Sequence, residues 1–573
     1  MVTPTSTEQA SGYTRNKRRA LLRLGLLATV IVLVNVVLSG FFFRIDLTQE
    51  KRYSLSTPTK VLLEEQQDIV FVQIFLAGEL TPNMQQLQNA TVEMLKQFRA
   101  YGKENIQWEI VNPFDITDEV SLGKYIKELE EKGIYSIPFG SADREQSSRS
   151  FLFPYASVTY QGNTLSLLLL DQVQPLTPLY DPTTAVSLLE YKFSKSIRLL
   201  SNRNKPDIAF IEGHDELDTM QVQDMAISLS ELYNIYRLDL PQSDFIDTIY
   251  EVIVIAKPRS AFSDADKYKI DQYLMYGGSI LWLIDPVLAE FDSLRYTGEF
   301  LPVEYDLNIM DQLIQYGARV NSNLIQDKQC TRIKVPYGNT FEDRPWIYNP
   351  VLTGFNKQHP ITANVDAIEG KFVSDVDTTQ VAGISKTVLL TTSANSRFIR
   401  MGTRVNYNVV QSQYMPRDEQ FNHPNLAVAV LLEGSFPSAF STRQPTAKAM
   451  ERNGIGNGPF RATGVPARQI VVGDGDMMRN VVDKDGKIFP LGANNIERYI
   501  FGNKDFLMNC IEYMTDNTGL METRAKEVKL RPIDKEKVEA NRTQWQLINI
   551  AAPILLIYLF SGIYNYIRNR KYA

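Results

Sequence analysis

Two long apolar runs, one near each end of the chain, most constrain what this sequence can fold into. The first covers residues 24–43 without a charge and follows a basic cluster, which consists of Arg15, Lys17, Arg18, Arg19 and Arg23. A helix of about 20 apolar residues matches the roughly 30 Å hydrocarbon core of a bilayer. Because the cations precede the run, the positive-inside rule predicts that residues 1–23 stay in the cytoplasm and that the following chain is translocated.

The second run covers residues 547–567, which carry no charge, and three cations follow it at Arg568, Arg570 and Lys571. This pattern predicts a second spanning helix whose last residues, 568–573, return to the cytoplasm. Pro553 lies within the run, where neighbouring helices can satisfy the carbonyl that it frees. Both termini are therefore expected in the cytoplasm, with the long middle region on the other side of the membrane.

Each run has an alternative interpretation. A cleaved secretory signal usually has an apolar core of only about 7–15 residues that ends at small residues. Here the run is longer, and the Leu38-Ser39-Gly40 segment is followed by three phenylalanines instead of a polar mature start. The run 547–567 could also be a buried helix of a soluble domain, although its terminal position and basic flank favour a membrane span.

The region between the two runs is acidic. The whole chain has a formal charge of −6, to which the first 23 residues contribute +4 and the last six contribute +3, so the rest carries −13. Phosphate backbones and anionic lipid headgroups repel an acidic surface, which argues against a nucleic-acid partner. The roughly 500 residues involved are enough for three or four domains.

Residues 44–200 have the pattern of a small α/β domain. Apolar strand patterns at 68–76 and 106–111 flank a segment whose apolar residues recur every three or four positions, as in an amphipathic helix. This connection is long enough to join a parallel pair of strands. A hairpin that turns at residues 161–163 and a closing helix near 185–200 complete the predicted domain.

Residues 201–516 alternate uniformly apolar strands with amphipathic helices. Strands are expected at 208–211 and in the segments YEVIVIAKP and SILWLIDP, with helices near 220–232 and 263–276. Such alternation is typical of an open parallel sheet with helices on both faces. We therefore predict an α/β fold with Rossmann-like or flavodoxin-like parallel sheets, bracketed by two single transmembrane helices.

The last part of this region contains a segment without periodicity. Residues 441–467 are rich in Gly, Pro, Asn and Arg, which predicts a flexible surface loop. The segment RQIVVGDGD that follows is expected to be a strand that closes the sheet, covered by a helix at 503–514. The charged segment 517–546 is expected to link the large domain to the second span.

The two cysteines do not indicate a compartment. Cys510 shares one face of the predicted helix with Phe506, Leu507 and Ile511. This position favours a buried thiol over a disulfide with Cys330.

Two acidic turns are the strongest candidates for chemistry, and the first is Gly473-Asp474-Gly475-Asp476. It follows a predicted strand, and ligands of open α/β sheets bind at the carboxyl ends of strands. Asp474 and Asp476 could therefore hold a divalent cation through oxygen ligands. The alternative is a tight turn with glycine at positive φ and an aspartate that caps the next helix.

The second turn, Glu212-Gly213-His214-Asp215, also follows a predicted strand. His214 could be a general base or a ligand, and a turn or docking role is the alternative. The chain contains no HExxH, CxxC, GxSxG or GxxxxGK[ST] motif. We therefore treat Glu212, His214, Asp474 and Asp476 as ligand-binding or structural-turn candidates and expect no catalytic residue, metal or cofactor.

Seven segments, considered together, carry a resemblance to a known family. They are RIDLTQEKRYSLS, FIEGHDEL, LLEGSFPSAF, IVVGDGDMMRN, FGNKDFLMNCIEYMTDNTGL, VKLRPIDK and WQLINIAAPILL. Their order and spacing resemble the gliding-motility-associated ABC-transporter auxiliary proteins of the Bacteroidota, the GldG family. The resemblance covers both apolar runs and essentially all of the region between them.

This resemblance implies a periplasm-facing subunit of the bacterial inner membrane that works with a separate GldF-type permease and a separate GldA-type ATPase. Other envelope or gliding proteins are further candidate partners. It also implies a Rossmann-like domain similar to that of intraflagellar-transport proteins, a substrate-binding-like role without a defined substrate, and no catalytic residue to carry over.

We therefore predict a non-enzymatic auxiliary subunit of an ABC transporter. Two spanning helices are too few to form a pore, so they are expected to pack against permease helices. Small residues allow such close approach, and the candidate positions are Gly25, Ala28, Ser561 and Gly562.

Two alternative functions come from other classes. The first is a membrane-tethered periplasmic metal-dependent hydrolase that uses Asp474, Asp476 and His214. The second is a solute-binding module with its cleft between the first two α/β domains. The hydrolase predicts a bound metal, and the module predicts a ligand-dependent shift in melting temperature.

Overall fold

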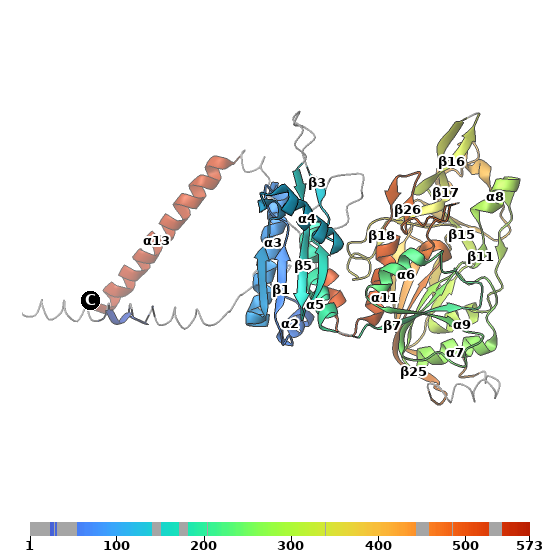
Figure 1. Cartoon of the computed structure of the whole chain (residues 1–573), viewed down its shortest axis with the longest axis horizontal. Coiled ribbons are helices and arrows are strands. Elements are labelled where there is room, and N and C mark those ends of the chain that lie inside the picture. The colour runs from blue at the N-terminus through green and yellow to red at the C-terminus, as the bar shows by residue number, and fades with distance from the viewer. Residues whose placement is uncertain are drawn as a thin grey trace, which may run out of the picture. The chain divides into compact units, whose positions relative to one another are not determined.

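A computed structural model shows the arrangement of the chain (Figure 1). It describes residues 54–139, 150–170, 182–202, 204–338, 340–442, 458–483, 485–525 and 541–572, together with Arg23, Gly25–Leu27, Thr29, Val30 and Val32. The chain divides into two compact units, Met1–Glu527 and Val528–Ala573, which are described separately. Most of the first predicted membrane helix, including Ala28, lies outside the described residues.

The N-terminal part of the first unit contains a four-stranded sheet in the order β2-β1-β5-β6. Its strands are β1 (Val70–Ile74), β2 (Ile106–Ile110), β5 (Tyr155–Tyr160) and β6 (Asn163–Leu168). β1 and β2 are parallel, which confirms the predicted strand-helix-strand unit, and β5 and β6 form the predicted hairpin. β5 runs antiparallel to β1, so the small sheet is mixed.

Three helices bury the apolar side of this small sheet. They are α2 (Thr57–Glu64), α3 (Pro82–Gly102) and α5 (Pro182–Ser201). The buried residues of α3, such as Leu87, Leu95 and Phe98, share one core with Val70 and Val72 of the sheet. The remaining elements of this part are η1 (Lys103–Asn105), η2 (Pro113–Asp115), α4 (Glu119–Glu131), β3 (Ile137–Phe139) and β4 (Ser150–Leu152).

The large sheet has eight strands in the order β18-β21-β24-β25-β10-β9-β7-β8. The parallel half consists of β7 (Asp207–Glu212), β8 (Asn234–Asp239), β9 (Tyr250–Ala256), β10 (Ser279–Leu283) and β25 (Thr463–Val472). The antiparallel half adds β18 (Gly354–Phe355), β21 (Ile384–Thr391) and β24 (Ala427–Pro437).

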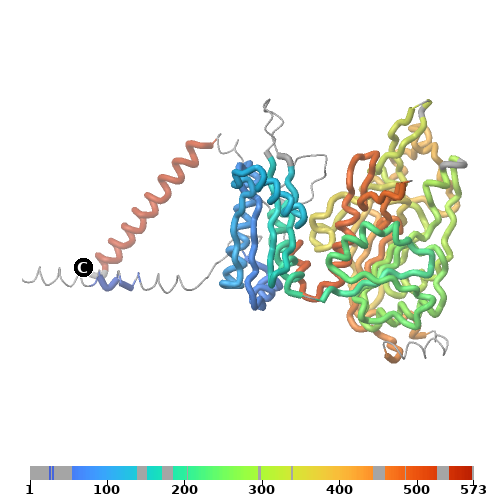
Figure 2. The backbone as a smooth tube through the Cα atoms, viewed as in Figure 1, coloured from blue at the N-terminus to red at the C-terminus, as the bar shows by residue number. Residues whose placement is uncertain are grey.

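The predicted parallel sheets are therefore present only in part, because both sheets also contain antiparallel strands, and the α/β class is confirmed. A strand that is buried on both faces has a uniformly apolar sequence whichever way it runs, so the pattern does not reveal direction. β25 also does not close the sheet, because β24 and β10 flank it. Figure 2 shows this late strand among much earlier segments of the chain.

Helices cover both faces of the parallel half, as the alternation of strands and helices predicts (Figure 1). Residues of α6 (Gln223–Ser230) and α11 (Asn503–Thr515) share one core with Val252 and Val254 of β9. Residues of α7 (Asp264–Met275) and α9 (Met310–Tyr316) share the other core with the intervening Ile253 and Ile255. The alternating side chains of each strand thus supply two separate cores.

Segments that lie between β10 and β24 in the sequence form a smaller layer with its own core around Trp346. Its main element is the hairpin of β16 (Cys330–Tyr337) and β17 (Thr340–Leu352). The other elements of the large region are β11 (Val287–Leu288), α8 (Phe291–Thr297), β12 (Glu299–Phe300), β13 (Val303–Glu304), β14 (Ala318–Val320), β15 (Asn323–Asp327), β19 (Ile368–Glu369), β20 (Val376–Thr378), β22 (Ser396–Arg400), β23 (Val405–Asn406), η3 (Tyr407–Val410), η4 (Asp418–Gln420), η5 (Gly475–Met478), β26 (Ala493–Asn494) and β27 (Tyr499–Ile500).

The structure tests the predictions for the loop at 441–467, the linker at 517–546 and the two cysteines. The predicted loop at 441–467 is shorter at its end, because β25 begins at Thr463 and pairs there with β24; residues 443–457 lie outside the described residues. η6 (Leu520–Ala525) falls within the predicted linker, yet its Leu520 and Met521 are buried. Both cysteines are free and Cys510 is buried, as expected for the thiol.

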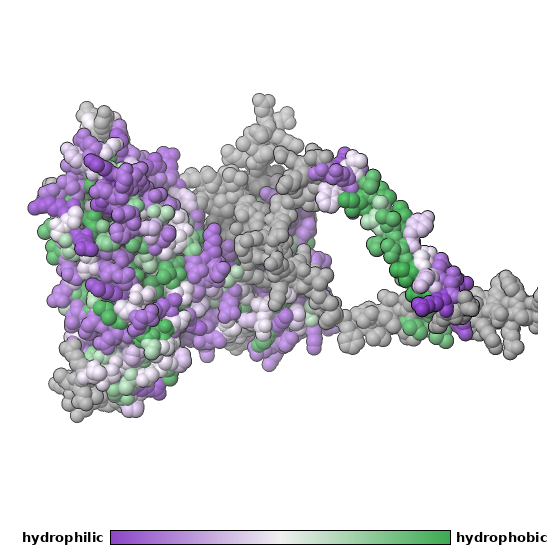
Figure 3. Space-filling view, turned by 180° about the vertical axis from the view of Figure 1, so that it is seen from behind, coloured by the Kyte–Doolittle hydropathy of each residue, from purple (hydrophilic) through white to green (hydrophobic). Residues whose placement is uncertain are grey.

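In the second unit the structure describes the helix α13 (Arg542–Tyr572), which includes Pro553. Among the described residues, the stretch Arg542–Arg570 is the one helix long and apolar enough to cross a membrane. Its apolar side chains are exposed, and Figure 3 shows the hydrophobic surface along it. Two flanking membrane helices were predicted, and the described residues support the one at the C-terminus.

Candidate functional site

Three neighbouring parallel strands of the large sheet end at one edge, and each is followed by a charged residue. Lys257 comes directly after β9, Asp285 comes two positions after β10, and Asp474 comes two positions after β25. The pairing of β9, β10 and β25 places these ends side by side. The rule that sites of α/β sheets lie at the carboxyl ends of strands therefore points to this edge.

The side chains at this edge form an ion-pair network, here called the Lys257 cluster, of Lys257, Asp285, Glu290, Asp476 and Arg479. The Lys257 Nζ lies 2.6 Å from Asp476 Oδ2, 3.1 Å from Asp285 Oδ2 and 3.2 Å from Glu290 Oε1. Arg479 contacts the other oxygens of Asp476 and Glu290, at 3.2 and 3.5 Å. The side chain of Lys257 is only 1% exposed, so this network is closed to solvent at its centre.

Burial and charge act against each other in the Lys257 cluster. Burial alone would lower the pKa of Lys257, but Asp285, Asp476 and Glu290 raise it above its ordinary value. Burial raises the pKa of Asp285, which Lys257 opposes. For Asp476, burial is outweighed by Lys257 and Arg479, and the pKa is lowered. Lys257 and Asp476 are thus a charged pair at neutral pH.

Asp474 is adjacent to the Lys257 cluster and caps the short helix η5 (Gly475–Met478). Its Oδ1 accepts a hydrogen bond from the Asp476 N–H at 2.9 Å, and its Oδ2 accepts one from the Lys371 N–H at 3.0 Å. Burial and the neighbouring Asp285 and Asp476 raise the pKa of Asp474 well above its ordinary value. The capping role that the sequence offered as an alternative is present at η5.

The glycines of this turn have a different role from the predicted one. Neither Gly473 nor Gly475 has a positive φ. A Cβ on Gly475 would lie 2.7 Å from the Lys257 Cγ, and one on Gly473 would lie 2.1 Å from the Ser374 carbonyl oxygen. Close packing, and not a left-handed backbone, therefore requires glycine at both positions.

The arrangement differs from an open cation site. The ammonium of Lys257 donates to Asp476 Oδ2 and Arg479 donates to Asp476 Oδ1, so both oxygens of this carboxylate already contact a cationic side chain. Among the described residues, no group of three or more His, Cys, Asp or Glu side chains could hold a metal ion. His214 makes its contacts in a separate network, so the structure does not bring it together with Asp474 and Asp476.

His214 connects the turn after β7 to α7. Its Nδ1 lies 3.3 Å from Glu216 Oε1, its Nε2 lies 3.4 Å from Asp266 Oδ2, and its ring stacks on Phe262 at 3.8 Å. Burial alone would lower the pKa of His214, but the hydrogen bonds to Asp266 and Glu216 raise it to about 9. A charged imidazolium between two carboxylates is thus a structural tie between the turn after β7 and α7.

This tie predicts a specific pH dependence of stability. Because the folded-state pKa of His214 is about 9 and lies above the ordinary 6.5, its contribution is complete below pH 6.5 and is lost as the pH rises through 9. We expect wild type to lose about 2 kcal/mol relative to His214→Gln between pH 6.5 and 9.5. Urea unfolding of both proteins across this range measures the difference. Parallel pH profiles of the two proteins would contradict the assignment.

Glu212 belongs to neither network. It forms an ion pair with Arg237 of β8, at the edge strand of the large sheet. Its side chain is 41% exposed. Glu212 and His214 are thus close in sequence but contact different partners.

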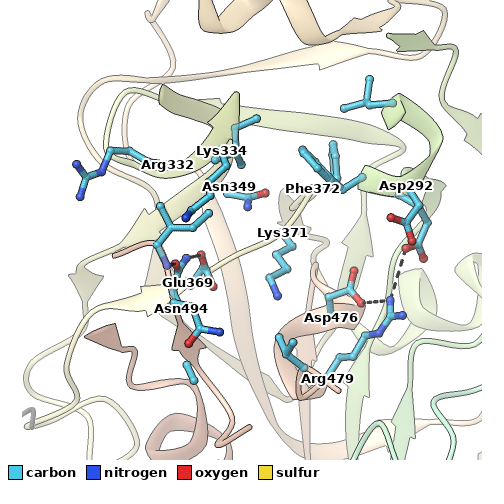
Figure 4. Close-up of a pocket in the computed structure, with 18 of the residues that line it drawn as sticks. Asp292, Arg332, Lys334, Asn349, Glu369, Lys371, Phe372, Asp476, Arg479 and Asn494 are labelled. Atoms are coloured by element: carbon cyan, nitrogen blue, oxygen red, sulfur yellow. Dashed lines mark hydrogen bonds and ion pairs between the residues drawn. The ribbon is translucent and has the colours of Figure 1, made fainter. Parts of the chain in front are cut away.

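A cavity of about 1150 Å³ opens beside the Lys257 cluster. Its floor includes Asp476 and Arg479, and its walls come from α8, the β16–β17 hairpin, the segment 369–372 and β26. Figure 4 shows Lys371 in the middle of this lining, between Asn494 and Asp476. The volume slightly exceeds the range of roughly 300–1,000 Å³ that is usual for small-molecule pockets.

Sequence reasoning found Asp476 but missed the residues that surround it. Lys257 and Asp285 follow apolar strands, so the rule applied to Asp474 could have found them. Lys371 and Glu369 come from a segment without periodicity, and no local signal places them near the turn.

The small residues predicted to pack against permease helices lie in helical segments where the structure describes them. Ser561 and Gly562 lie in α13, and a Cβ on Gly562 would meet no atom within 4 Å. Gly25 is helical, and its carbonyl accepts a hydrogen bond of 2.9 Å from Thr29 Oγ1. Packing of these positions against another helix stays a prediction.

Comparisons with known proteins add to this geometry. A family model described as an ABC-type uncharacterized transport system matches residues 205–510, and a domain of unknown function matches residues 49–159. The chain is 23% identical over 359 residues to an uncharacterized protein of Borreliella burgdorferi, a match that covers 61% of this chain. The chain spans only 64% of the length of that curated relative.

Among solved structures, the chain is similar to one described as the mmIFT52 N-terminal domain. The sequence identity is 14% and the TM-score is 0.29, with 54% of this chain and 98% of that chain covered.

Proposed function

Because the chain belongs to the family of the ABC-type uncharacterized transport system, we propose that it is a non-catalytic auxiliary subunit of an ABC transporter. The match over residues 205–510 carries this proposal, since it includes the whole parallel half of the large sheet. The edge of that sheet supports a non-catalytic role, because its charged residues are engaged with one another in the Lys257 cluster.

The proposal places the protein in the membrane through α13. The exposed apolar surface of this helix and the basic residues after it support a span with a cytoplasmic C-terminus. The run 24–43 is proposed as a second span, with residues 44–200 and 201–516 as two periplasmic α/β domains. Attaching a reporter that is active on one side of the membrane to residue 573 and, separately, within 441–457 tests this topology.

The finer assignment follows the sequence resemblance. We propose that the partners are a GldF-type permease and a GldA-type ATPase of the bacterial inner membrane, in a complex associated with gliding motility. The chain itself has no phosphate-loop motif, so the energy of nucleotide hydrolysis would come from a separate subunit.

Purification in mild detergent tests the proposed association. We expect a permease and an ATPase to copurify with the full chain and to be strongly depleted when the chain is truncated at Arg542. The physical reason is that small residues such as Ser561 and Gly562 allow close helix packing within the membrane. Mass spectrometry of the purified complex measures the partner chains.

The matched control keeps a membrane span but changes its surface. In this variant, residues 542–572 are replaced by an unrelated spanning helix, and the partner chains should still be lost. Gly562→Leu is expected to weaken the association without affecting the fold, since no described atom lies near that position. Recovery of the full-length protein alone, under conditions that preserve other transporter complexes, would contradict the proposal.

A further inference from the structure

Some charged side chains around the cavity form hydrogen bonds or ion pairs within the chain, and others do not. Every carboxylate of the lining has a partner within the chain, and these carboxylates are Asp218, Glu290, Asp292, Glu369 and Asp476. Two of the four lining cations are also paired, Arg332 with Glu497 and Arg479 with Asp476. The cavity therefore has no unsatisfied carboxylate but retains available positive groups.

Lys371 is the half-buried cation of the lining, and its charge helps to lower the pKa of the neighbouring Asp476. Its backbone N–H donates to Asp474 Oδ2, which fixes the residue next to the Lys257 cluster. Its ammonium has no hydrogen bond or ion pair with any residue that the structure describes. Figure 4 shows its side chain reaching into the space between the cavity walls. An ammonium held in this way is a site for a carboxylate of a ligand.

Asn349 provides a second available polar group. It lies in β17 on the cavity wall, half-buried, and its side-chain amide has no hydrogen-bond partner among the described residues. By contrast, Asn494 is engaged, since it donates to Glu369 and accepts from the Ile496 N–H. A free side-chain amide both donates and accepts, as the peptide group does.

Aromatic side chains supply the apolar part of the lining. Phe291, Phe372 and Tyr407 line the cavity. The rings of Phe291 and Phe372 pack edge-to-face with the buried Trp346 ring, with centroids 5.9 and 6.4 Å away. Such rigid aromatic surfaces favour an apolar side chain of a ligand. The cavity thus combines the half-buried cation Lys371, the amide of Asn349 and an apolar wall, and its other lysine, Lys334, is exposed.

We infer that this cavity binds the free carboxyl end of a short peptide. The terminal carboxylate contacts the Lys371 ammonium, the last peptide group contacts the Asn349 amide, and the last side chain lies against Phe291 and Phe372. The volume of about 1150 Å³ is larger than a single amino acid requires and leaves room for preceding residues. This inference concerns the cavity alone, so it can fail while the association with transporter subunits holds.

Titration calorimetry of the full chain in detergent tests the inference with the tripeptide Ala-Ala-Phe. We expect measurable binding at submillimolar concentration, and binding at least about tenfold weaker for the same peptide with an amidated carboxyl end. Lys371→Met is expected to weaken binding of the free tripeptide by a similar factor. Lys371→Arg should retain most of it, because the positive charge remains.

Two controls separate binding from folding. Lys127→Met removes an exposed lysine of α4 and should leave the titration unchanged. Lys371→Met should keep the thermal midpoint of wild type, because its ammonium has no ion pair to lose. Equal affinity for the free and amidated peptides, unchanged binding by Lys371→Met, or no binding of Ala-Ala-Phe at millimolar concentration would each overturn the inference.

Discussion

Replacing Lys257 with methionine is expected to lower the free energy of unfolding by about 3–5 kcal/mol, because removal of one partner leaves buried charges uncompensated. Three carboxylates lie within 3.2 Å of its Nζ, and its side chain is 1% exposed. Methionine keeps nearly the same length, so the loss reports on charge and not on packing. Urea unfolding of the full chain, followed by tryptophan fluorescence, measures it.

A matched variant and a compensating variant make this result specific. Lys371→Met removes a lysine from the same edge but no ion pair, and it should change the free energy of unfolding by less than about 0.5 kcal/mol. Adding Asp476→Asn to Lys257→Met should recover part of the loss, because one unpaired carboxylate is removed. A loss below about 1 kcal/mol for Lys257→Met would show that solvent reaches the cluster.

Replacing Trp282 with alanine is the second change with a large expected effect, a loss of about 3–5 kcal/mol. Trp282 lies in β10, in the middle of the large sheet, and is 0% exposed. Its Nε1 donates a hydrogen bond of 2.9 Å to Gln469 Oε1 on β25. The substitution therefore leaves a large cavity and also removes the partner of a buried amide.

Trp282→Phe separates these two contributions. Phenylalanine fills most of the space but cannot donate to Gln469, so we expect a smaller loss of about 1–3 kcal/mol. Both variants are compared with wild type by urea unfolding of the full chain. If Trp282→Ala cost no more than Trp282→Phe, the packing of this indole in the core would be contradicted.

Local features of the fold were predictable from the sequence. The helices α3, α5, α7 and α11 and the strands β1, β2, β7, β9 and β10 lie where periodicity and apolar runs predict them. The parallel pairing of β1 and β2 followed from the length of their connection. The C-terminal apolar run forms α13, as its composition predicts.

The candidate site was only partly predictable. Asp474 and Asp476 were found because they follow a strand, and the structure places Asp476 in the lining of a cavity, with Asp474 hydrogen-bonded to its backbone N–H. Lys257, the ion-pair partner of Asp476, is 219 residues away from it in the sequence, so no motif with fixed spacing joins the two residues. An aspartate at this turn could bind either a metal cation or a lysine ammonium, and the sequence alone does not show which of the two it contacts.

The sequence by itself determined the features that depend on neighbours along the chain: the helical and strand periods, the apolar runs, the acidic middle region and the family resemblance. Tertiary structure alone decided the direction and order of strands, since β25 lies between β24 and β10. It also decided that Lys257 neutralises Asp476 while Lys371 stays available in the cavity. The physical reason is that charge pairing and strand order depend on contacts between residues that are far apart in the sequence.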